Sequence, residues 1–154
     1  MATAKKINVV TKGKEGEREI VNALEPIVRR VMTELEIPLP AGKVVQRNQN
    51  QSSVGGSDLA NVFGLAIEVK RQESISLNAW WKQCTAAATR NNELPVLIYR
   101  QNHKEWRVVM NAGFVLGDGS QIIARAEMEW YMFLYWFERW VRLYLMRQGM
   151  TARV

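Results

Sequence analysis

The sequence predicts a mixed α/β domain built around a central β-sheet. Helical and β-type patterns of apolar residues alternate along the chain, in the order helix, strands, helix, strands, helix. That order packs helices against a shared sheet. The chain has 154 residues, the usual size of one domain, and its 47% of hydrophobic and 23% of charged residues are ordinary for a folded globular protein.

The first helix is expected at residues 13–36, where apolar residues recur every three or four positions. Its apolar members are Ile20, Leu24, Ile27, Val28, Val31 and Leu35. Pro26 lies inside the pattern, so we expect a kink, or two helices that meet near Glu25. Residues 1–12 carry lysines but no apolar stretch of signal-peptide type, and we interpret them as a basic N-terminal tail.

The middle of the chain predicts strands on either side of one helix. A short strand is expected at residues 43–48, and two more within residues 57–71, separated by a turn at 61–64. A helix follows at residues 77–92. The runs "LPVLIYR" and "EWRVVM" are rich in β-branched residues and predict paired strands, and a further turn is expected at Asp118-Gly119.

The last element is expected to be a long helix at residues 125–148, after a domain that spans residues 13–124. Its sequence is apolar on nearly all sides, which indicates deep burial, an oligomer interface or a membrane surface. The charged residues in the run argue against a membrane span; they are Glu129, Glu138, Arg139 and Arg142. A small domain cannot readily bury every side of one helix, so we favour a homodimer interface, with an amphipathic membrane anchor as the alternative.

Charge and cysteine usage restrict the function. A net charge of +6 favours a polyanionic partner, most simply nucleic acid and otherwise an anionic membrane surface. Cys84 is the only cysteine, so no internal disulfide forms and a reducing, cytosolic setting is expected. The only histidine, His103, lies in a predicted turn, which argues against Ser-His or Cys-His catalysis and against a His-rich zinc site.

The stretch "LAIEVK" carries two charges within an apolar strand. Side chains alternate across a strand, so Leu65, Ile67 and Val69 share one face. Ala66, Glu68 and Lys70 share the other face, which leaves room for a ligand to approach. If the two strands of residues 57–71 are antiparallel neighbours, Asp58 comes close to Glu68.

Two carboxylates that converge with a lysine suit a magnesium-dependent phosphodiesterase. Mg²⁺ prefers oxygen ligands and keeps several waters, and it polarises a phosphate while it lowers the pKa of an attacking water. A lysine can orient that water or offset the negative charge that builds on phosphorus. The alternative is a cross-strand ion pair on a solvated face of the sheet, and the motif alone does not decide between the two.

Two further side chains favour the site. Glu17 lies three residues before Ile20 and so on nearly the same helical side, from which it can reach inward; an acidic first helical turn is the plainer explanation. Gln83 lies in the helix that follows the Lys70 strand, where its amide can brace a carboxylate or a water, although a solvated helix position would also accept it.

These residues resemble the PD-(D/E)xK nuclease superfamily, and "KGKEGEREIVNAL" followed by "IEVK" is most similar to the Holliday junction resolvases of archaea and phages. The likeness covers roughly residues 12 to 110. It implies a restriction-endonuclease-like fold: a central mixed β-sheet flanked by helices, here with an extra long C-terminal helix. Ser57 stands where the superfamily name has proline, the spacing from Glu17 to Asp58 is longer than in small archaeal enzymes, and the C-terminal helix has no counterpart.

The resemblance implies roles for individual residues. Catalytic functions fall on Glu17, Asp58, Glu68, Lys70 and Gln83. Asp58 and Glu68, with the backbone carbonyl of Val69 and possible help from Glu17, would bind Mg²⁺, for which Mn²⁺ would substitute. DNA phosphates would be contacted by the basic residues that flank the site in sequence, namely Lys12, Lys14, Lys43, Arg47, Arg71 and Lys82.

Three functional hypotheses follow. The first is a metal-dependent endonuclease that resolves four-way DNA junctions as a homodimer, in the cytosol of a bacterial or archaeal cell and encoded by the host or a phage. The second keeps the nuclease site but places it on other DNA, as in restriction-type or flap and fork endonucleases, because fold and site do not decide substrate. The third is a basic DNA-binding protein in which Glu68 and Lys70 merely pair. The polar loop "NQNQSS" is a candidate DNA-facing segment, and of Trp80 and Trp81 one is expected in the core.

Overall fold

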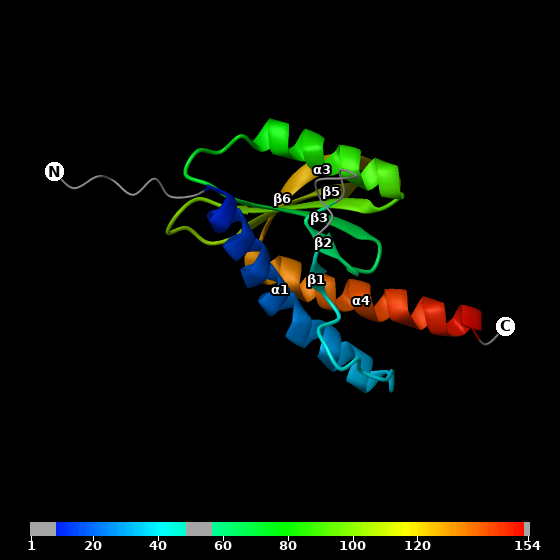
Figure 1. The fold of residues 1–154 in the computed structure, drawn as a ribbon. Helices are drawn as coiled ribbons and strands as arrows, with labels where there is room; N and C mark the ends of the chain where they lie inside the picture. The colour runs from blue at the N-terminus through cyan, green and yellow to red at the C-terminus, as the bar shows by residue number, and fades with distance from the viewer. Residues whose placement is uncertain (1–8, 49–56, 153–154) are drawn as a thin grey trace.

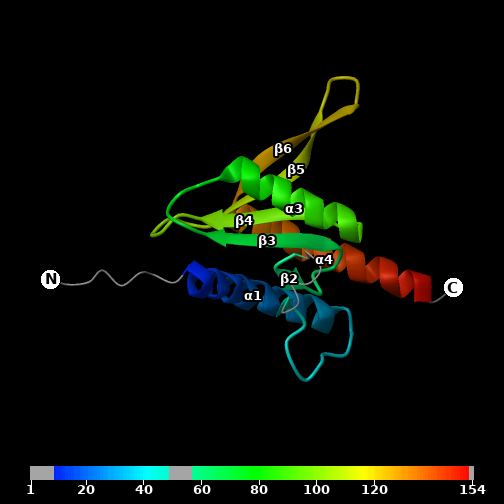
Figure 2. The same ribbon diagram turned by 45° about the horizontal axis from the view of Figure 1, so that its top comes forward.

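A four-stranded sheet lies between one helix on its first face and two helices on its second (Figures 1 and 2). The computed structural model describes residues 9–48 and 57–152, with side chains for 12–48 and 57–149. The elements in chain order are α1 (Val9–Glu34), β1 (Gln46–Arg47), β2 (Leu59–Ala60), β3 (Leu65–Arg71), α3 (Leu77–Asn91), β4 (Leu94–Arg100), β5 (Arg107–Val115), β6 (Gln121–Glu129) and α4 (Trp130–Ala152). The expected mixed α/β architecture is confirmed.

The sheet has the strand order β3-β4-β5-β6 and mixes both orientations. Strands β3 and β4 are parallel, which requires a crossover, and α3 supplies it. The predicted pairing of residues 94–100 with the next strand is confirmed, since β4 and β5 run antiparallel. β5 and β6 then form a hairpin whose turn contains Gly119 at a φ of 88°, as expected for the Asp118-Gly119 turn. The short strands β1 and β2 pair separately.

Each face of β3 has its own layer of side chains. The face with Leu65, Ile67 and Val69 packs in the main core against α1 and α4. The apolar stripe of α1 predicted from the sequence is buried there, with Ile20 and Leu24 fully covered. The opposite face meets α3, where a smaller cluster forms from Trp80, Cys84, Leu97, Tyr99 and Val109. Trp80 is buried and Trp81 half-buried, so one of the two tryptophans is in the core.

Helix α1 is longer than predicted. It begins at Val9 instead of residue 13, so it takes in part of the expected basic tail, and it continues across Pro26 without a break into two helices. Glu25, just before the proline, is held by two backbone N–H groups described below, which stabilises the chain at this point.

The last helix begins later than expected. Residues 125–129 belong to strand β6, and α4 starts at Trp130. The physical reason is a period of two in this stretch, where apolar and charged side chains alternate and pair with β5; the alternating residues are Ala124, Arg125, Ala126, Glu127, Met128 and Glu129. The expected boundary at residue 125 is therefore wrong.

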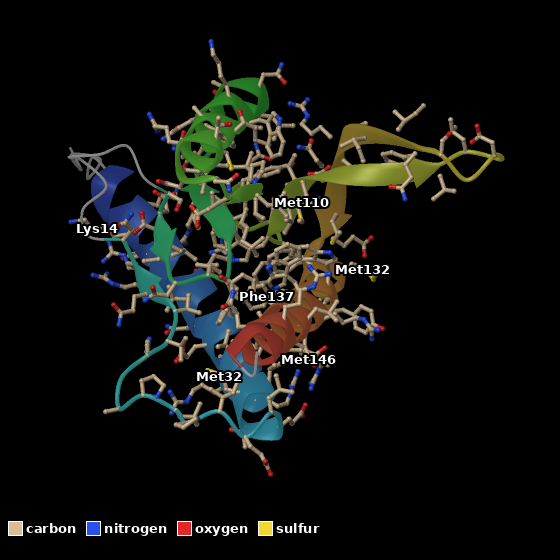
Figure 3. The ribbon with its side chains drawn as sticks, turned by 90° about the vertical axis from the view of Figure 1, so that its right-hand side faces the viewer. Lys14, Met32, Met110, Met132, Phe137 and Met146 are labelled. Atoms are coloured by element: carbon tan, nitrogen blue, oxygen red, sulfur yellow. The ribbon has the colours of Figure 1, made fainter. Side chains whose placement is uncertain are left out.

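Helix α4 is part of the same core. Phe133, Phe137 and Val141 are fully buried against the elements of the main core, and Figure 3 shows Phe137 inside the molecule. Its other faces remain open, with Tyr131 71% and Tyr135 60% exposed. Within the described residues, no helix is both long and apolar enough to cross a membrane.

Candidate active site

Asp58 lies at the free edge of β3. Its backbone N–H donates to the carbonyl of Ile67 at 3.0 Å, and its Oδ2 accepts the N–H of Val69 at 2.7 Å. Both bonds use the edge of β3 that does not pair with β4. Because the N–H and C=O of one strand residue point to the same edge, the Val69 carbonyl also faces the side on which Asp58 lies. The sequence-based expectation that Asp58 approaches Glu68 is confirmed.

Glu68 is a buried carboxyl with an incomplete set of partners. Its side chain is 1% exposed, and its Oε2 has no hydrogen-bond partner within the described residues. The pKa of Glu68 is raised from 4.5 to about 8, first by burial and then by the charge and the hydrogen bond of Asp58. A buried polar atom without a partner is rare and costly, so this oxygen is a candidate position for a ligand.

The face that carries Glu68 is covered and not open as the sequence suggested. Helix α3 lies over it, and the Cys84 thiol donates to the carbonyl of Ala66 at 3.7 Å. Burial, followed by the charge of Glu68, raises the pKa of Cys84 to about 12, which leaves this thiol inert as a nucleophile. At the edge of β3, by contrast, Asp58 is only half-buried.

Lys70 follows Glu68 on the same face of β3. The strand alternation places both side chains toward α3, in register with Leu97 and Tyr99 of β4. Lys70 is half-buried, and its positive charge lowers the pKa of Glu68 against the stronger effects of burial and Asp58. Lys70 thus lowers the pKa of Glu68 and Asp58 raises it, so the three side chains form one electrostatic group.

Glu17 approaches this group from α1. Helix α1 lies close to β3 at Gly16, where an added Cβ would be in van der Waals contact with the Cβ of Arg71 at 3.4 Å and with Val69 at 3.6 Å. Glu17 is 7% exposed, and its charge makes the smallest contribution that raises the pKa of Glu68. Its carboxylate accepts a hydrogen bond from the Nε of Arg47 at 2.7 Å, so a basic side chain already compensates it.

Glu25, two turns further along α1, is a buried carboxylate that sequence reasoning missed. Both of its oxygens accept backbone hydrogen bonds at 2.8 Å, from Val44 and from Val45. Arg29 adds an ion pair at 3.5 Å. This clamp fixes the segment before β1 against α1. The available signal was the spacing of eight residues from Glu17, which puts both acids on one side of a helix.

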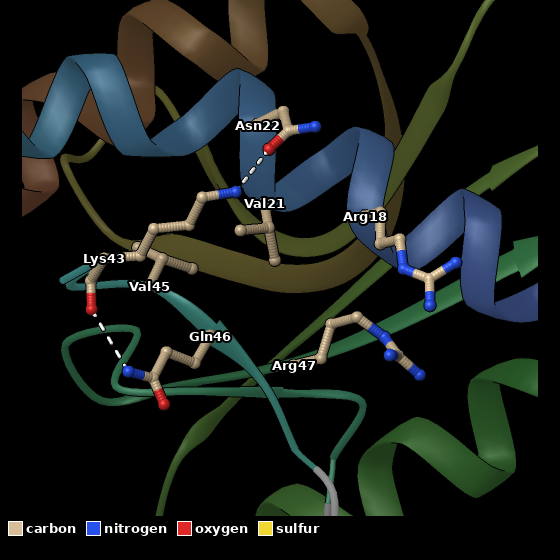
Figure 4. A pocket seen from close by; sticks show the side chains of 7 residues that line it. All are labelled: Arg18, Val21, Asn22, Lys43, Val45, Gln46 and Arg47. Carbon is tan, nitrogen blue, oxygen red and sulfur yellow. Dashed lines mark hydrogen bonds between the residues drawn. The ribbon is translucent and has the colours of Figure 1, made fainter.

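A basic hollow of about 410 Å³ lies between α1 and the segment that enters β1 (Figure 4). Its lining residues are Arg18, Val21, Asn22, Lys43, Val45, Gln46 and Arg47. The Lys43 ammonium donates to Asn22 Oδ1 at 2.6 Å across its mouth, and Gln46 donates to the Lys43 carbonyl at 3.2 Å. Arg47 connects the hollow to the acidic group through Glu17.

The remaining predicted residues lie in different surroundings. Arg71 forms ion pairs of 3.7 Å with Glu15 and 3.6 Å with Glu19, on the α1 side of the sheet. Lys82 and Gln83 are exposed on α3, and Gln83 directly precedes Cys84, whose thiol is close enough to Glu68 to feel its charge.

Two more predicted DNA contacts lie on α1. Lys12 is half-buried and Lys14 is exposed near the start of the helix (Figure 3). The predicted DNA-facing loop falls mostly on residues 49–56, outside the described residues.

The acids at this site suit a hard cation. No group of three or more His, Cys, Asp or Glu side chains placed to hold a metal occurs in the described ranges 9–48 and 57–152. Two carboxylates do converge, however, and one of their oxygens lacks a partner. Mg²⁺ commonly binds through one or two carboxylates and keeps waters in its other positions, so this donor set fits that ion.

Comparison with known proteins gives one family. Residues 8–130 match the family described as "Phage putative PDDEXK endonuclease". A search of curated protein sequences found no match. Among solved structures, a Holliday junction resolvase from the archaeon Archaeoglobus fulgidus is similar with a TM-score of 0.40 and 19% identity, over 63% of this chain and 70% of the other. This distant structural likeness carries no information on activity.

Proposed function

Because the chain belongs to the phage PD-(D/E)xK endonuclease family, we propose that it is a metal-dependent endonuclease that resolves four-way DNA junctions as a homodimer. The observation that carries the catalytic part is the buried Glu68 carboxyl, whose Oε2 lacks a partner among the described residues and which meets a second carboxyl, Asp58. A cation between them would compensate both charges. The alternative of a simple ion pair with Lys70 leaves that oxygen unexplained.

Asp58 and Glu68 would hold the metal together with the backbone carbonyl of Val69. Mg²⁺, or Mn²⁺ in its place, polarises a phosphate and lowers the pKa of an attacking water when it is bound. The N–H of Val69 holds Asp58 in place, and burial under α3 fixes Glu68. The raised pKa of Glu68 keeps this carboxyl protonated at neutral pH without a cation, so metal binding would release a proton.

Lys70 supplies the positive charge of the site. Its ammonium is near enough to Glu68 to lower the pKa of that carboxyl, and its position on a rigid strand limits its movement. It would orient the attacking water or donate to phosphate oxygens as negative charge builds there. Glu17 would organise the site through Arg47, and Gln83 would support it from α3.

The basic hollow would receive the DNA backbone next to the scissile phosphate. Arg18, Lys43 and Arg47 present three positive charges in its walls, and the amides of Asn22 and Gln46 add donors. Contacts of this kind hold a strand without reading its bases, which suits an enzyme that recognises branch structure. Lys12, Lys14, Arg71 and Lys82 would extend the phosphate contacts beyond the hollow.

The homodimer is proposed from symmetry and from the open faces of α4. A four-way junction needs two cuts in strands of like polarity, and a two-fold dimer presents two equal sites. Helix α4 exposes large apolar side chains, including Tyr131 and Tyr135 at 71% and 60%. Exposed apolar surface of this kind commonly marks a protein interface.

The direct test is cleavage of a synthetic four-way junction with Mg²⁺ by the natural chain and by Glu68→Gln. We expect at least a ~1000-fold loss of rate in the variant, because the metal loses a charged ligand. Glu36→Gln is the matched control, since Glu36 is an exposed carboxylate just after α1 and its loss should leave the rate unchanged. Equal rates in the natural chain and Glu68→Gln would refute the site.

The competing functions are separate outcomes of the same assay. Cleavage of linear duplex or of flaps and forks as fast as junctions would favour a restriction-type or flap endonuclease. Tight junction binding without cutting under any divalent ion would favour a DNA-binding protein that does not cleave. Retention of both carboxyls and the lysine in one group argues against that last outcome.

A further inference from the structure

The β5–β6 hairpin extends beyond the body of the protein as an arm. Strand β5 pairs with β4 only through Arg107, Val108 and Val109. From Met110 onward β5 has β6 as its only partner among the described strands, and the two-stranded ribbon projects away from the helices (Figures 2 and 3). Isolated two-stranded ribbons are marginally stable in water, so an arm of this kind gains from a partner surface.

One face of the arm is apolar along its whole length. Residues directly opposite in an antiparallel pair share a face. The pairs on this face are Val108 with Met128, Met110 with Ala126, Ala112 with Ala124, and Phe114 with Ile122. Val108, Met110 and Met128 of the first two pairs belong to the main core, so the same apolar face runs from the core to the tip, where Phe114 is 51% and Ile122 55% exposed.

An apolar hollow lies at the root of this same face. Its volume is about 410 Å³, and its walls include Leu94, Pro95, Met110, Ala112, Ala126 and Trp136. Trp136 comes from α4, and Met132 of that helix lies beside the base of the arm (Figure 3). Large side chains thus stand at the tip, alanines in the middle, and a hollow at the root.

The geometry points to a second copy of this chain as the occupant: two arms pack face to face and antiparallel, and the tip of each fills the hollow of the other. The tip pair, Phe114 with Ile122, and the root pair, Met110 with Ala126, are four residues apart on each strand, or about 13 Å. That separation is the same in both copies, so a two-fold axis through Ala112 and Ala124 places each tip over the other root. The small alanines allow the two ribbons to approach closely.

The surface has the area and the polarity of a modest dimer interface. Leu94, Phe114, Ile122 and Met132 are each 44–55% exposed, which together with the alanines and Trp136 amounts to roughly 600 Å² per copy, or ~1200 Å² in total, the lower end for a specific interface. The four pairs on this face contain no cation, so DNA phosphates are poorly suited to it. The inference specifies the homodimer of the proposed function, but it depends on neither metal nor cleavage.

Adjacent isoleucines on the arm provide a matched test. Ile122 lies on the apolar face and Ile123 on the opposite face, at 55% and 65% exposure. We expect Ile122→Glu to weaken dimerisation of the full chain roughly a hundredfold in sedimentation equilibrium, because a carboxylate would be buried among apolar groups. Ile123→Glu, which places the same charge on the opposite face of the arm, is expected to keep the dimer. A natural chain that stays monomeric at all concentrations, or an Ile122→Glu chain that dimerises normally, would overturn the inference.

A cross-link tests the contact itself without disrupting it. Mixing Ile122→Cys with Ala126→Cys under mild oxidation should join the two copies, because a two-fold axis along the line from Ala112 to Ala124 places Ile122 of one copy over Ala126 of the other. The native Cys84 is buried and contributes little background. Efficient cross-linking without any junction cleavage would support the packing of the two arms and refute the nuclease. Cleavage without cross-linking would support the nuclease and refute the packing of the arms.

Discussion

Glu25 and Glu68 are both buried carboxyls, yet their surroundings differ completely. Glu25 is 7% exposed and accepts two backbone N–H groups at 2.8 Å, one on each oxygen. Glu68 is 1% exposed, stands beside a second acid, and has one oxygen without a partner in the described structure. Burial alone therefore does not identify a functional acid. Glu25, whose two oxygens both have partners, holds a segment of chain against α1. Glu68, whose Oε2 has no partner in the described structure, is a candidate position for a ligand.

The same comparison predicts opposite effects on stability. Removing the ionisable group of Glu68 relieves a cost that the metal-free folded protein bears once the pH approaches the raised pKa of this carboxyl, because a buried carboxylate without compensation is unfavourable. Replacing Glu25 by its amide leaves one of two backbone N–H groups without an acceptor. A site that is tuned for function commonly reduces stability, whereas a structural clamp does not.

The largest expected effect is a pH-dependent stability that originates at Glu68. In the unfolded chain this carboxyl titrates near its ordinary pKa of 4.5, and in the folded chain its pKa is about 8. The folded state therefore holds a proton that the unfolded state loses, so the stabilising contribution is complete below pH 4.5 and is lost as the pH rises to about 8. Urea unfolding of the metal-free protein between pH 4.5 and 8.5 would measure this decline.

The Glu68→Gln variant isolates the contribution of that single group. Its stability should exceed that of the natural chain at pH 8, with a difference that shrinks toward pH 4.5, because glutamine has no proton to lose. Groups that do not interact with Glu68 titrate equally in both chains and cancel in the difference. Parallel curves over this range would contradict the assignment of the shifted pKa to Glu68.

A smaller effect of opposite sign is expected for Glu25→Gln. The amide offers one acceptor in place of two, so one of the Val44 and Val45 N–H groups loses its partner, at a cost of about 1–3 kcal/mol in the free energy of unfolding. Chemical denaturation at pH 7 measures it, with Glu36→Gln as the exposed control. An unfolding free energy equal to that of the natural chain would show that the clamp is dispensable.

Periodic patterns in the sequence predicted the fold well. The apolar stripe of α1, the alternation in β3 and the paired strands β4 and β5 are local signals that tertiary packing did not override. The start of α4 was misplaced because residues 125–129 are rich in Ala, Glu and Met, which favour helices, while their period of two, satisfied by pairing with β5, decided the structure.

The candidate site was predictable only in part. The alternation in "IEVK" and one turn were sufficient to bring Asp58 to Glu68. Other features depend on contacts between distant segments, for which a single sequence gives little signal. They are the packing of α3 over Glu68, the ion pair of Arg47 with Glu17, and the hydrogen bonds that Glu25 accepts from Val44 and Val45. The protruding arm depends in turn on where β4 stops pairing with β5, which is a property of the assembled sheet.

The smallest expected effect concerns Glu17, whose surroundings are intermediate between those of Glu25 and Glu68. Its carboxylate is paired with Arg47, and it also contributes to the pKa of Glu68. Arg47→Gln should cost only about 1 kcal/mol in stability, because the pair is partly solvated. It should raise KM for junction DNA more than it lowers kcat, since the guanidinium lines the basic hollow.

Lys43→Gln is the matched variant: Lys43 is an exposed cation of the same hollow, so its loss should raise KM with no change in stability. A large drop in kcat for Arg47→Gln, with stability unchanged, would instead assign Glu17 and Arg47 to the reacting group around Glu68.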